Sequence, residues 1–115
     1  METKRYCLTL DLVDDPELIQ LYKKYHSPEG IWPEIPQGIK SVGITRMDIY
    51  LLGTRLFMIL EMPESVDRDE AMAKLATLPR QDEWEATVGK CQLCDPNATS
   101  SGKWQLMEQI FTLPE

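Results

Sequence analysis

The residues best suited to chemistry in this chain lie in one short run, residues 22–34, which holds the only histidine among 115 residues. Histidine is the side chain whose ordinary pKa lets it both accept and donate a proton near neutral pH. Tyr22 precedes His26 by one helical turn, so on a helix the phenol and the imidazole share a face. Trp32 and Glu34 follow after a turn. An acid/base group, a phenol, an indole and a carboxylate together suit binding and turnover of a small polyhydroxylated molecule.

Each of these residues also has a purely structural interpretation. A histidine near a helix C-terminus can simply cap it, because the imidazolium is favoured there. Glu34 can cap its own helix, and Asp48 can form a surface ion pair with Arg46 two residues earlier on the same strand face. The tryptophans of the chain can all be packed in the core: Trp32, Trp84 and Trp104. The chain shows neither a glycine-rich phosphate loop nor a Ser/His/Asp set. A reaction here would therefore depend on proton transfer and positioning.

Length and charge limit the possible classes of protein. A chain of 115 residues forms one domain, residues 1–115, with a modest core that oligomerisation would supplement. The net charge of −7 argues against a nucleic-acid surface and against an anionic membrane. No apolar run approaches the roughly 20 residues of a spanning helix, and the N-terminal residues lack the apolar stretch of a signal peptide. We expect a cytoplasmic protein.

The cysteines do not indicate a metal site or a disulfide framework. Cys91 and Cys94 form a single C-x-x-C pair, whereas a zinc site needs about four ligands. Cys7 and His26 have no zinc-like spacing to that pair. We expect ordinary buried or half-buried thiols near a helix end, with a redox pair as the alternative, and no metal.

The pattern of apolar and polar residues predicts an alternation of strands and helices. Strict alternation predicts a strand over residues 6–12. Asp15 and Pro16 form a strong helix start, as N-cap and first helical residue, and Gly53-Thr54 separates two strands of a hairpin. The remaining expected segments are as follows: helices over 16–26, 33–41, 65–76 and 81–93, strands over 44–52, 55–62 and 104–113, and a polar loop over 95–102.

This order indicates an α+β fold of the ferredoxin-like, split β-α-β type, with a four-stranded antiparallel sheet and helices on one face. The other face of so small a sheet needs a cover, and a second copy of the chain is the simplest one. We therefore expect a homodimer formed through the sheet, of the dimeric α/β-barrel type.

The residues also resemble a known family, the L-rhamnose mutarotases. The most specific match is Tyr22-x-x-x-His26 followed by Ile-Trp-Pro-Glu, ending at Glu34. The hairpin Asp48-Ile-Tyr-Leu and the closing segment Leu-Met-Glu-Gln-Ile-Phe, ending at Phe111, also match. The resemblance covers residues 5–113.

The resemblance implies a ferredoxin-like protomer in a homodimer that interconverts the α and β anomers of a 6-deoxy sugar without cofactor or metal. It places the acid/base group on His26 and a substrate-binding phenol on Tyr22, and Trp32 stands at the family's Ile-Trp-Pro tryptophan. We expect Trp32 and Trp84 to cover the apolar face of the sugar, and Glu34 and Asp48 to accept hydrogen bonds from it.

The chain also departs from the family pattern. The loop between His26 and Trp32 is two residues longer, and Met47 stands where the family has a second binding tyrosine. A Trp-Trp pair is reduced to Trp84, flanked by Glu83 and Glu85. The acid/base core is thus kept while the sugar-contacting residues differ, a pattern that resembles the L-fucose branch of the family. Three alternatives stay open: another cofactor-free enzyme on this fold, a non-catalytic sugar-binding or regulatory dimer, and a plain structural dimer.

Overall fold

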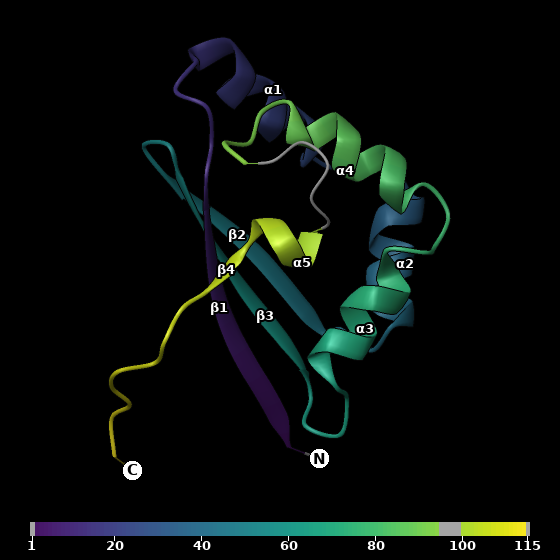
Figure 1. Cartoon of the computed structure of the whole chain (residues 1–115), viewed down its shortest axis with the longest axis vertical. Coiled ribbons are helices and arrows are strands. Elements are labelled where there is room, and N and C mark those ends of the chain that lie inside the picture. Colours follow the sequence, from purple (N-terminus) through teal and green to yellow (C-terminus); the bar gives the residue numbers. More distant parts are fainter. Residues whose placement is uncertain (1, 95–99, 115) are drawn as a thin grey trace.

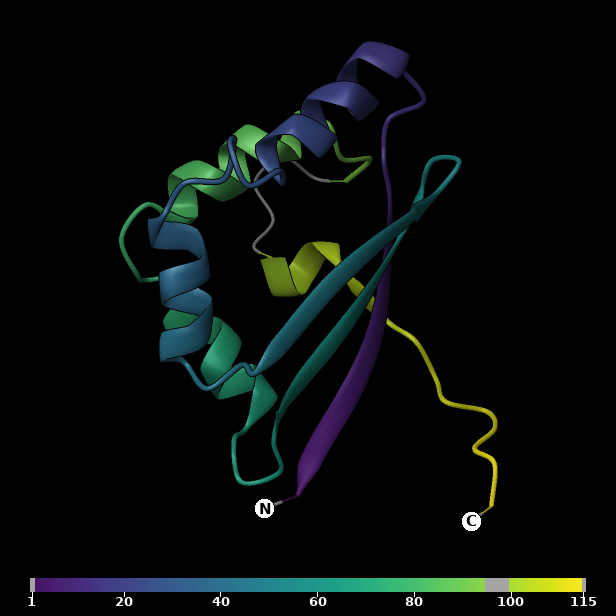
Figure 2. The ribbon, with the colours of Figure 1, turned by 180° about the vertical axis from the view of Figure 1, so that it is seen from behind.

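The computed structural model describes residues 2–94 and 100–114 and shows a four-stranded antiparallel sheet with helices packed on one face (Figures 1 and 2). The strand order is β2-β3-β1-β4, which is the order of a split β-α-β, ferredoxin-like sheet. The α+β fold class predicted from the sequence is confirmed. The strands are β1 (Thr3–Asp11), β2 (Arg46–Leu52), β3 (Arg55–Pro63) and β4 (Gln105–Leu106).

Most helices form where local signals predict them. Asp15 caps α1 by accepting hydrogen bonds from the backbone N–H groups of Glu17 and Leu18, and Pro16 is the first helical residue. In the described part of the chain, the third and fourth helices are shorter than predicted, because residues 65–67 form a turn and N-cap, and residues 90–93 leave the helix. The bounds are α1 (Pro16–Tyr25), α2 (Glu34–Ser41), α3 (Arg68–Leu75), α4 (Gln81–Gly89) and α5 (Ser100–Lys103).

The core lies between the sheet and the helices. Alternate residues of β3 are buried, and their partners on β1 and β2 in the sheet face the same side. The intervening residues of β3, Phe57 and Ile59, are only half-buried and lie on the face that no helix covers. The buried side chains of β3 are Leu56, Met58, Leu60 and Met62. No helix of the described residues is long and apolar enough to cross a membrane.

The closing strand predicted over 104–113 is wrong for most of its length. β4 pairs with β1 only at Leu8 and Thr9, and the segment after Met107 leaves the sheet on the side away from the helices (Figure 1, yellow). Apolar residues occur here in adjacent pairs, at 106–107 and 110–111, so no single face of a strand collects them. Of the predicted polar loop, residues 95–99 lie outside the described residues, and 100–103 form α5.

The cysteines are free thiols, as predicted: Cys91 is buried, and Cys7 and Cys94 are half-buried. Burial raises the pKa of the Cys91 thiol, which makes it a weak nucleophile at neutral pH. The Asn97 sequon lies outside the described residues.

The loop after α1 is closed tightly by its own side chains. Ser27 donates its hydroxyl to the carbonyl of Lys24 at 2.6 Å and accepts from the N–H of Gly30 at 3.2 Å. This closure brings the backbone of Gly30 against the Lys24 carbonyl, so that an added methyl group would collide with it. Glycine is therefore required at position 30 for the chain to return toward the core at Ile31.

Gly30→Ala should destabilise the protein by about 1–3 kcal/mol, because backbone atoms must shift to admit the methyl group. Urea unfolding measures the loss. Gly53→Asn is the control: Gly53 has a φ of 61° with no atom near an added Cβ, and asparagine tolerates that conformation. Equal stability of Gly30→Ala and wild type would contradict the tight closure.

Candidate active site

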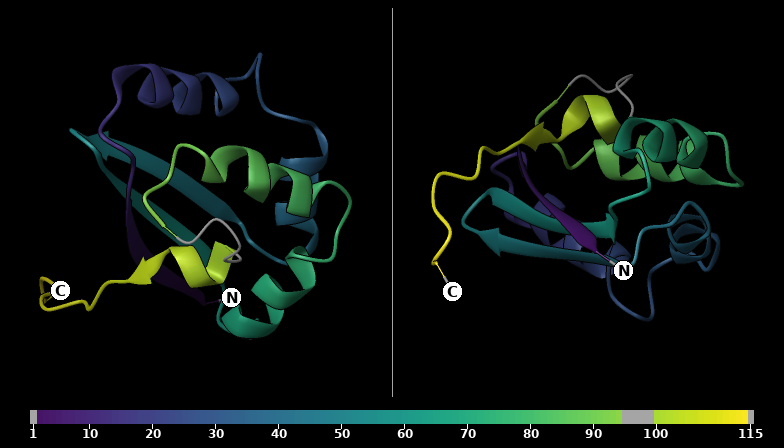
Figure 3. Two further views of the ribbon diagram at one scale, coloured as in Figure 1. Left: turned by 45° about the horizontal axis from the view of Figure 1, so that its top comes forward. Right: turned by 90° about the horizontal axis from the view of Figure 1, so that it is seen from below.

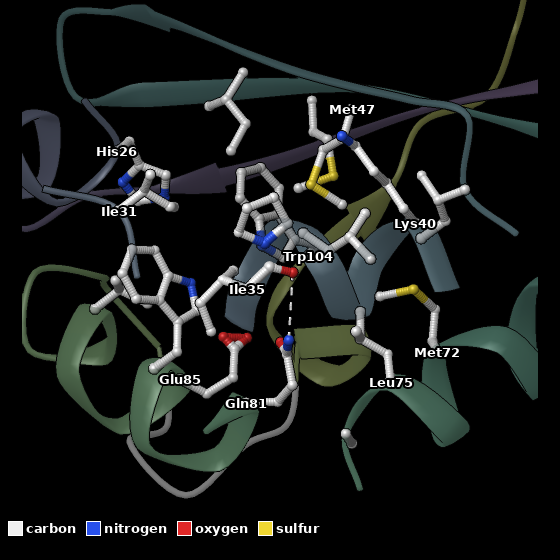
Figure 4. A pocket seen from close by; sticks show the side chains of 18 of the residues that line it. His26, Ile31, Ile35, Lys40, Met47, Met72, Leu75, Gln81, Glu85 and Trp104 are labelled. Atoms are coloured by element: carbon white, nitrogen blue, oxygen red, sulfur yellow. Dashed lines mark hydrogen bonds between the residues drawn. The ribbon is translucent and has the colours of Figure 1, made fainter. Parts of the chain in front are cut away.

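Figure 3 shows the helices on one side of the sheet. A cavity of about 580 Å³ lies between the sheet and the helices (Figure 4). Its walls are mostly aliphatic and sulfur-containing side chains, with a few polar groups. Figure 4 shows His26 and Ile31 at one end and Lys40, Met47 and Met72 at the other. The polar and aromatic residues that line it include Tyr22, His26, Gln81, Trp84, Glu85, Gln92 and Trp104. This composition, a mainly apolar concavity with a few convergent polar groups, is typical of a small-molecule site.

His26 lies at the C-terminal cap of α1, and its ring orientation is fixed by the helix itself. Its Nδ1 lies 2.7 Å from the carbonyl oxygen of Tyr22, one turn earlier. A carbonyl oxygen only accepts, so Nδ1 must carry the proton and donate it. In the neutral ring, Nε2 then holds a lone pair. The geometry thus prepares Nε2 as a proton acceptor.

Tyr22 is almost fully buried on the same helix, with its ring centroid 4.2 Å from that of His26. Its phenol oxygen accepts a long hydrogen bond, 3.5 Å, from Nε2 of the buried Gln92. The two residues that the i, i+4 spacing predicted to share a face therefore do meet, and both line the cavity.

Burial governs the protonation of both residues. Desolvation lowers the pKa of His26 below its ordinary value of 6.5, although the hydrogen bond to the Tyr22 carbonyl opposes the shift. Desolvation also raises the pKa of Tyr22 well above its ordinary range, and the negative charge of Glu85 adds to this. At neutral pH the site therefore holds a neutral imidazole able to accept a proton and a neutral phenol able to donate a hydrogen bond.

Trp84 stands at the centre of an aromatic cluster. Its ring meets those of His26, Trp32 and Tyr25 edge-on, with centroid separations of 5.2, 5.3 and 6.0 Å. Trp84 is buried and lines the cavity.

Trp32 and Glu34 are not among the residues that line the cavity. Trp32 packs against Trp84, and the guanidinium of Arg80 stacks on its ring at 4.0 Å. Arg80 also lies 3.5 Å from the Glu34 carboxylate. Arg80 therefore connects Trp32 and Glu34 beside the cavity. The N-cap residue of α2, Pro33, makes no side-chain capping hydrogen bond.

Asp48 lies on the opposite face of the sheet from the cavity. In the β2–β3 register it opposes Ile59, while its neighbour Met47 opposes the buried Leu60 on the helix side. Its carboxylate lies 3.7 Å from Arg46, the surface pair that the strand pattern had offered as the alternative. The structure therefore does not bring Asp48 to the cavity with His26.

Several residues that line the cavity could not be predicted from local sequence patterns. Gln92 and Trp104 reach the cavity from segments far along the chain, and no local pattern links them to Tyr22. Met47 and Glu85 could have been identified from the sequence, because both stand at or beside positions where the family has an aromatic residue. Among the described residues, no group of three or more His, Cys, Asp and Glu side chains has the arrangement of a metal site.

This fold and site define a class: a small α+β protein with a cavity of small-molecule size and one imidazole prepared for proton transfer. Comparisons with known proteins identify relatives of this chain. The sequence profile of the L-rhamnose mutarotase family matches residues 5–113. The chain is 35% identical, over its full length and 92% of the relative, to an L-fucose mutarotase of Xanthomonas campestris pv. campestris.

Two further proteins are similar. A UPF0734 protein of Dictyostelium discoideum is 39% identical over 96% of this chain and 90% of the relative. The crystal structure of an L-rhamnose mutarotase from Formosa agariphila superposes with a TM-score of 0.65, covering 96% of this chain and 99% of that one. At 16% identity, this last likeness shows a shared fold.

The chain belongs to the L-rhamnose mutarotase family, and it is accordingly a carbohydrate isomerase.

The protonation of His26 can be measured directly, because it is the only histidine in the chain. We expect its imidazole resonance to titrate with a midpoint below 6.5 in the folded protein. The unfolded chain then binds a proton more readily than the native one, so stability is full above pH 6.5 and declines as the pH falls below it. NMR titration of the ring protons gives the midpoint.

Urea unfolding at pH 7 and pH 5 tests the linked change in stability. His26→Gln should lose less stability than wild type between these two values, because it has no group to protonate. A native midpoint at or above 6.5 would contradict the burial that we assign to this ring.

Proposed function

We propose that this protein interconverts the α and β anomers of a 6-deoxyhexose, with His26 moving the proton. The observation that carries the proposal is the neutral His26 ring, whose Nδ1 is bound by the Tyr22 carbonyl while the ring faces the cavity. The cavity volume of about 580 Å³ lies within the range of roughly 300–1,000 Å³ of small-ligand sites. The proposed proton transfer requires neither a cofactor nor a metal ion.

In the proposed reaction one proton moves from the anomeric hydroxyl to the ring oxygen O5, and it moves back when the ring closes. Nε2 of His26 takes the proton of the anomeric hydroxyl, C1=O1 forms, and the C1–O5 bond breaks with its electron pair going to O5. The imidazolium then gives its proton to O5, which yields the open-chain aldehyde. After rotation about C1–C2, the same steps run in reverse and O5 closes on the other face of C1. General acid–base catalysis of this kind contributes about 10²–10⁴-fold.

The other lining residues hold the sugar in this mechanism. The Tyr22 phenol donates a hydrogen bond to the sugar, since its raised pKa keeps it protonated. Trp84 covers the apolar face of the ring, together with the C6 methyl group, and Trp32 and Arg80 brace the indole from outside the cavity. Glu34 acts indirectly, because its carboxylate pairs with Arg80.

We propose L-fucose as the preferred substrate. The relative named as an L-fucose mutarotase is 35% identical over the full chain. The residues that depart from the rhamnose-type pattern, Met47 and the Trp84–Glu85 pair, also line the cavity. The free thiols of the described residues suit a reducing compartment, and we accordingly propose a cytoplasmic enzyme.

Saturation-transfer NMR of anomer exchange, with L-fucose and L-rhamnose side by side, tests the proposal. Wild type should accelerate exchange, L-fucose more than L-rhamnose, and His26→Gln should lose this acceleration by about 10²-fold or more. Tyr22→Phe should weaken sugar binding. Lys23→Gln, an exposed change on the same helix, is the control and should match wild type.

Two results would contradict the proposal. Tight sugar binding by the wild-type protein without exchange would make it a binding or regulatory protein. An unchanged exchange rate in folded His26→Gln would remove that residue from the proton transfer.

We further propose that the protein is a homodimer formed through the sheet, in which residues 108–114 of each copy dock along the free edge of β1 of the other. Three apolar residues of this segment, Ile110, Phe111 and Leu113, are 88%, 71% and 78% exposed in the single chain. Contiguous exposed apolar surface of this kind marks an interaction site.

The free edge of β1 is a suitable docking site for this segment. β1 is paired by β4 only at Leu8 and Thr9, so the first part of that strand edge, with exposed Lys4 and Arg5, has no neighbour among the described strands. An open strand edge is a template for another chain. The docking segment carries Glu108 and no basic residue, which complements the charge of Lys4, whereas Arg5 already pairs with Glu61.

Size-exclusion chromatography with light scattering should give twice the mass of one chain for wild type. Phe111→Asp should give the mass of one chain, because a buried, unpaired charge opposes docking. Thr112→Asp introduces the same charge at a neighbouring polar position and should stay dimeric. A single-chain mass for wild type, or a dimeric Phe111→Asp, would overturn the proposed docking.

A further inference from the structure

Gln92 is a buried polar side chain in the cavity wall that the proposed proton transfer does not use. It is 5% exposed and lines the cavity together with Tyr22. Burial of an amide costs free energy unless hydrogen bonds compensate it. The hydrogen bonds of this amide to the described residues are long: 3.5 Å from Nε2 to the Tyr22 phenol and 4.0 Å between Oε1 and Sγ of Cys94. Such contacts compensate weakly, so stability alone does not explain an amide here.

The backbone fixes Gln92 beside the helix that carries Tyr22. Leu12 and Gln92 form an isolated antiparallel bridge just after β1. On either side of this bridge, the backbone N–H groups of Val13 and Leu93 donate hydrogen bonds of 2.8 Å between the two segments. α1 begins shortly after this point. The end of β1 therefore holds the amide against the phenol, although the two residues lie 70 positions apart.

The chemistry of the two groups sets the direction of their hydrogen bond. The NH2 group of an amide only donates, whereas a phenol oxygen both accepts and donates. Nε2 of Gln92 therefore occupies an acceptor site of the Tyr22 oxygen and leaves the hydroxyl proton for another partner. The thiol of Cys94 agrees with this orientation, because it is a donor that faces Oε1 of the amide. Among residues 2–94 and 100–114, no acceptor for the phenol proton is found.

A second buried glutamine in the cavity wall, Gln81, shows the contrast. Its Nε2 lies 3.4 Å from the backbone carbonyl oxygens of Glu34 and Ile35, so it ties the start of α4 to α2. Those carbonyls belong to the framework of the fold. Gln92 instead donates to a side chain that lines the cavity, which makes its role one of orientation at the site.

We infer that Gln92 is a positioning residue for the substrate-binding phenol: its amide holds the Tyr22 oxygen as an acceptor, so that the hydroxyl proton is directed to an oxygen of the sugar. The inference deepens the proposed function and rests on it. Binding costs less free energy when the groups of a site already have the orientation that they need. Hydrogen bonds in unliganded sites are often long and tighten in the complex, which agrees with the 3.5 Å contact.

A double-mutant cycle tests the inference. Gln92→Met removes the amide with little change of shape and should raise KM for L-fucose by roughly 3- to 10-fold, the size of one neutral hydrogen bond, while changing kcat by less than about threefold. The value of kcat is kept because His26 is untouched. In the Tyr22→Phe background, Gln92→Met should have no further effect on KM, since the phenol that it orients is absent.

The concentration dependence of anomer exchange gives KM and kcat, and quenching of the fluorescence of Trp84 and Trp104, which line the cavity, gives affinities independently. Gln20→Met makes the same change at an exposed position of α1 and is the matched control, which should equal wild type. If Gln92→Met fails to fold, Gln92→Asn replaces it in the cycle, because the shorter side chain withdraws its amide from the phenol.

Infrared difference spectra between wild type and Tyr22→Phe observe the orientation directly. They isolate the C–O stretch of this phenol, whose frequency depends on whether the oxygen accepts or donates a hydrogen bond. The sugar-free protein should show an accepting phenol, and L-fucose should add the signature of a donor. In Gln92→Met the accepting signature should be lost.

The outcomes separate the two proposals. Absence of exchange with every sugar in wild type would overturn the proposed function, whereas wild-type exchange with an unchanged KM in folded Gln92→Met would overturn this inference only. An equal rise of KM in the wild-type and Tyr22→Phe backgrounds would also overturn it, because Gln92 would then bind the sugar by itself. So would a phenol that donates in the sugar-free protein.

Discussion

The arrangement of the site depends on one hydrogen bond, from Nδ1 of His26 to the carbonyl of Tyr22, 2.7 Å long. The carbonyl oxygen of Tyr22 already accepts the backbone N–H of His26 at 3.2 Å, and the bond from the imidazole of that residue adds a second donor. The same bond fixes the ring, sets its tautomer and leaves Nε2 as the acceptor. Because both residues lie on one helix, the phenol and the imidazole keep their relation as long as α1 is intact. The cap at Asp15 and the closure at Gly30 therefore support the site as well as the helix.

Two opposing effects act on the charge of His26, and burial prevails. A helix C-terminus favours an imidazolium, which is why a capping histidine was a reasonable interpretation of the sequence. The ring is enclosed by Tyr22 on its own helix and Trp84 on α4, and loss of solvent favours the neutral form. Trp84 is held in turn by Trp32, which Arg80 stacks upon. Residues outside the cavity thus help to hold the indole that encloses His26.

The fold and half of the site could be predicted from the sequence, because they depend on local signals. Asp15-Pro16, Gly53 and the alternation in β3 are each read within a few residues, and Tyr22 and His26 are one turn apart. The roles of Trp32, Glu34 and Asp48 depended on where separate elements meet. Asp48 shows the reason: one step along a strand moves a side chain to the other face of the sheet, and only the register with β3 decides which face is buried. Gln92, Lys103 and Trp104 were missed because their partners lie far away in the chain.

The departures from the family pattern acquire a physical meaning when they are placed in the cavity. Met47 puts a flexible apolar side chain where an aromatic hydroxyl is expected, so that part of the wall loses a hydrogen-bonding group. Glu85, beside the retained Trp84, gives the opposite change and adds a charge to another wall. The Lys103 side chain of α5 is fully buried 3.9 Å from this carboxylate, whose charge offsets the cost of burying the ammonium group. The polar groups of the cavity wall therefore differ from the family pattern, whereas the imidazole at its end is retained.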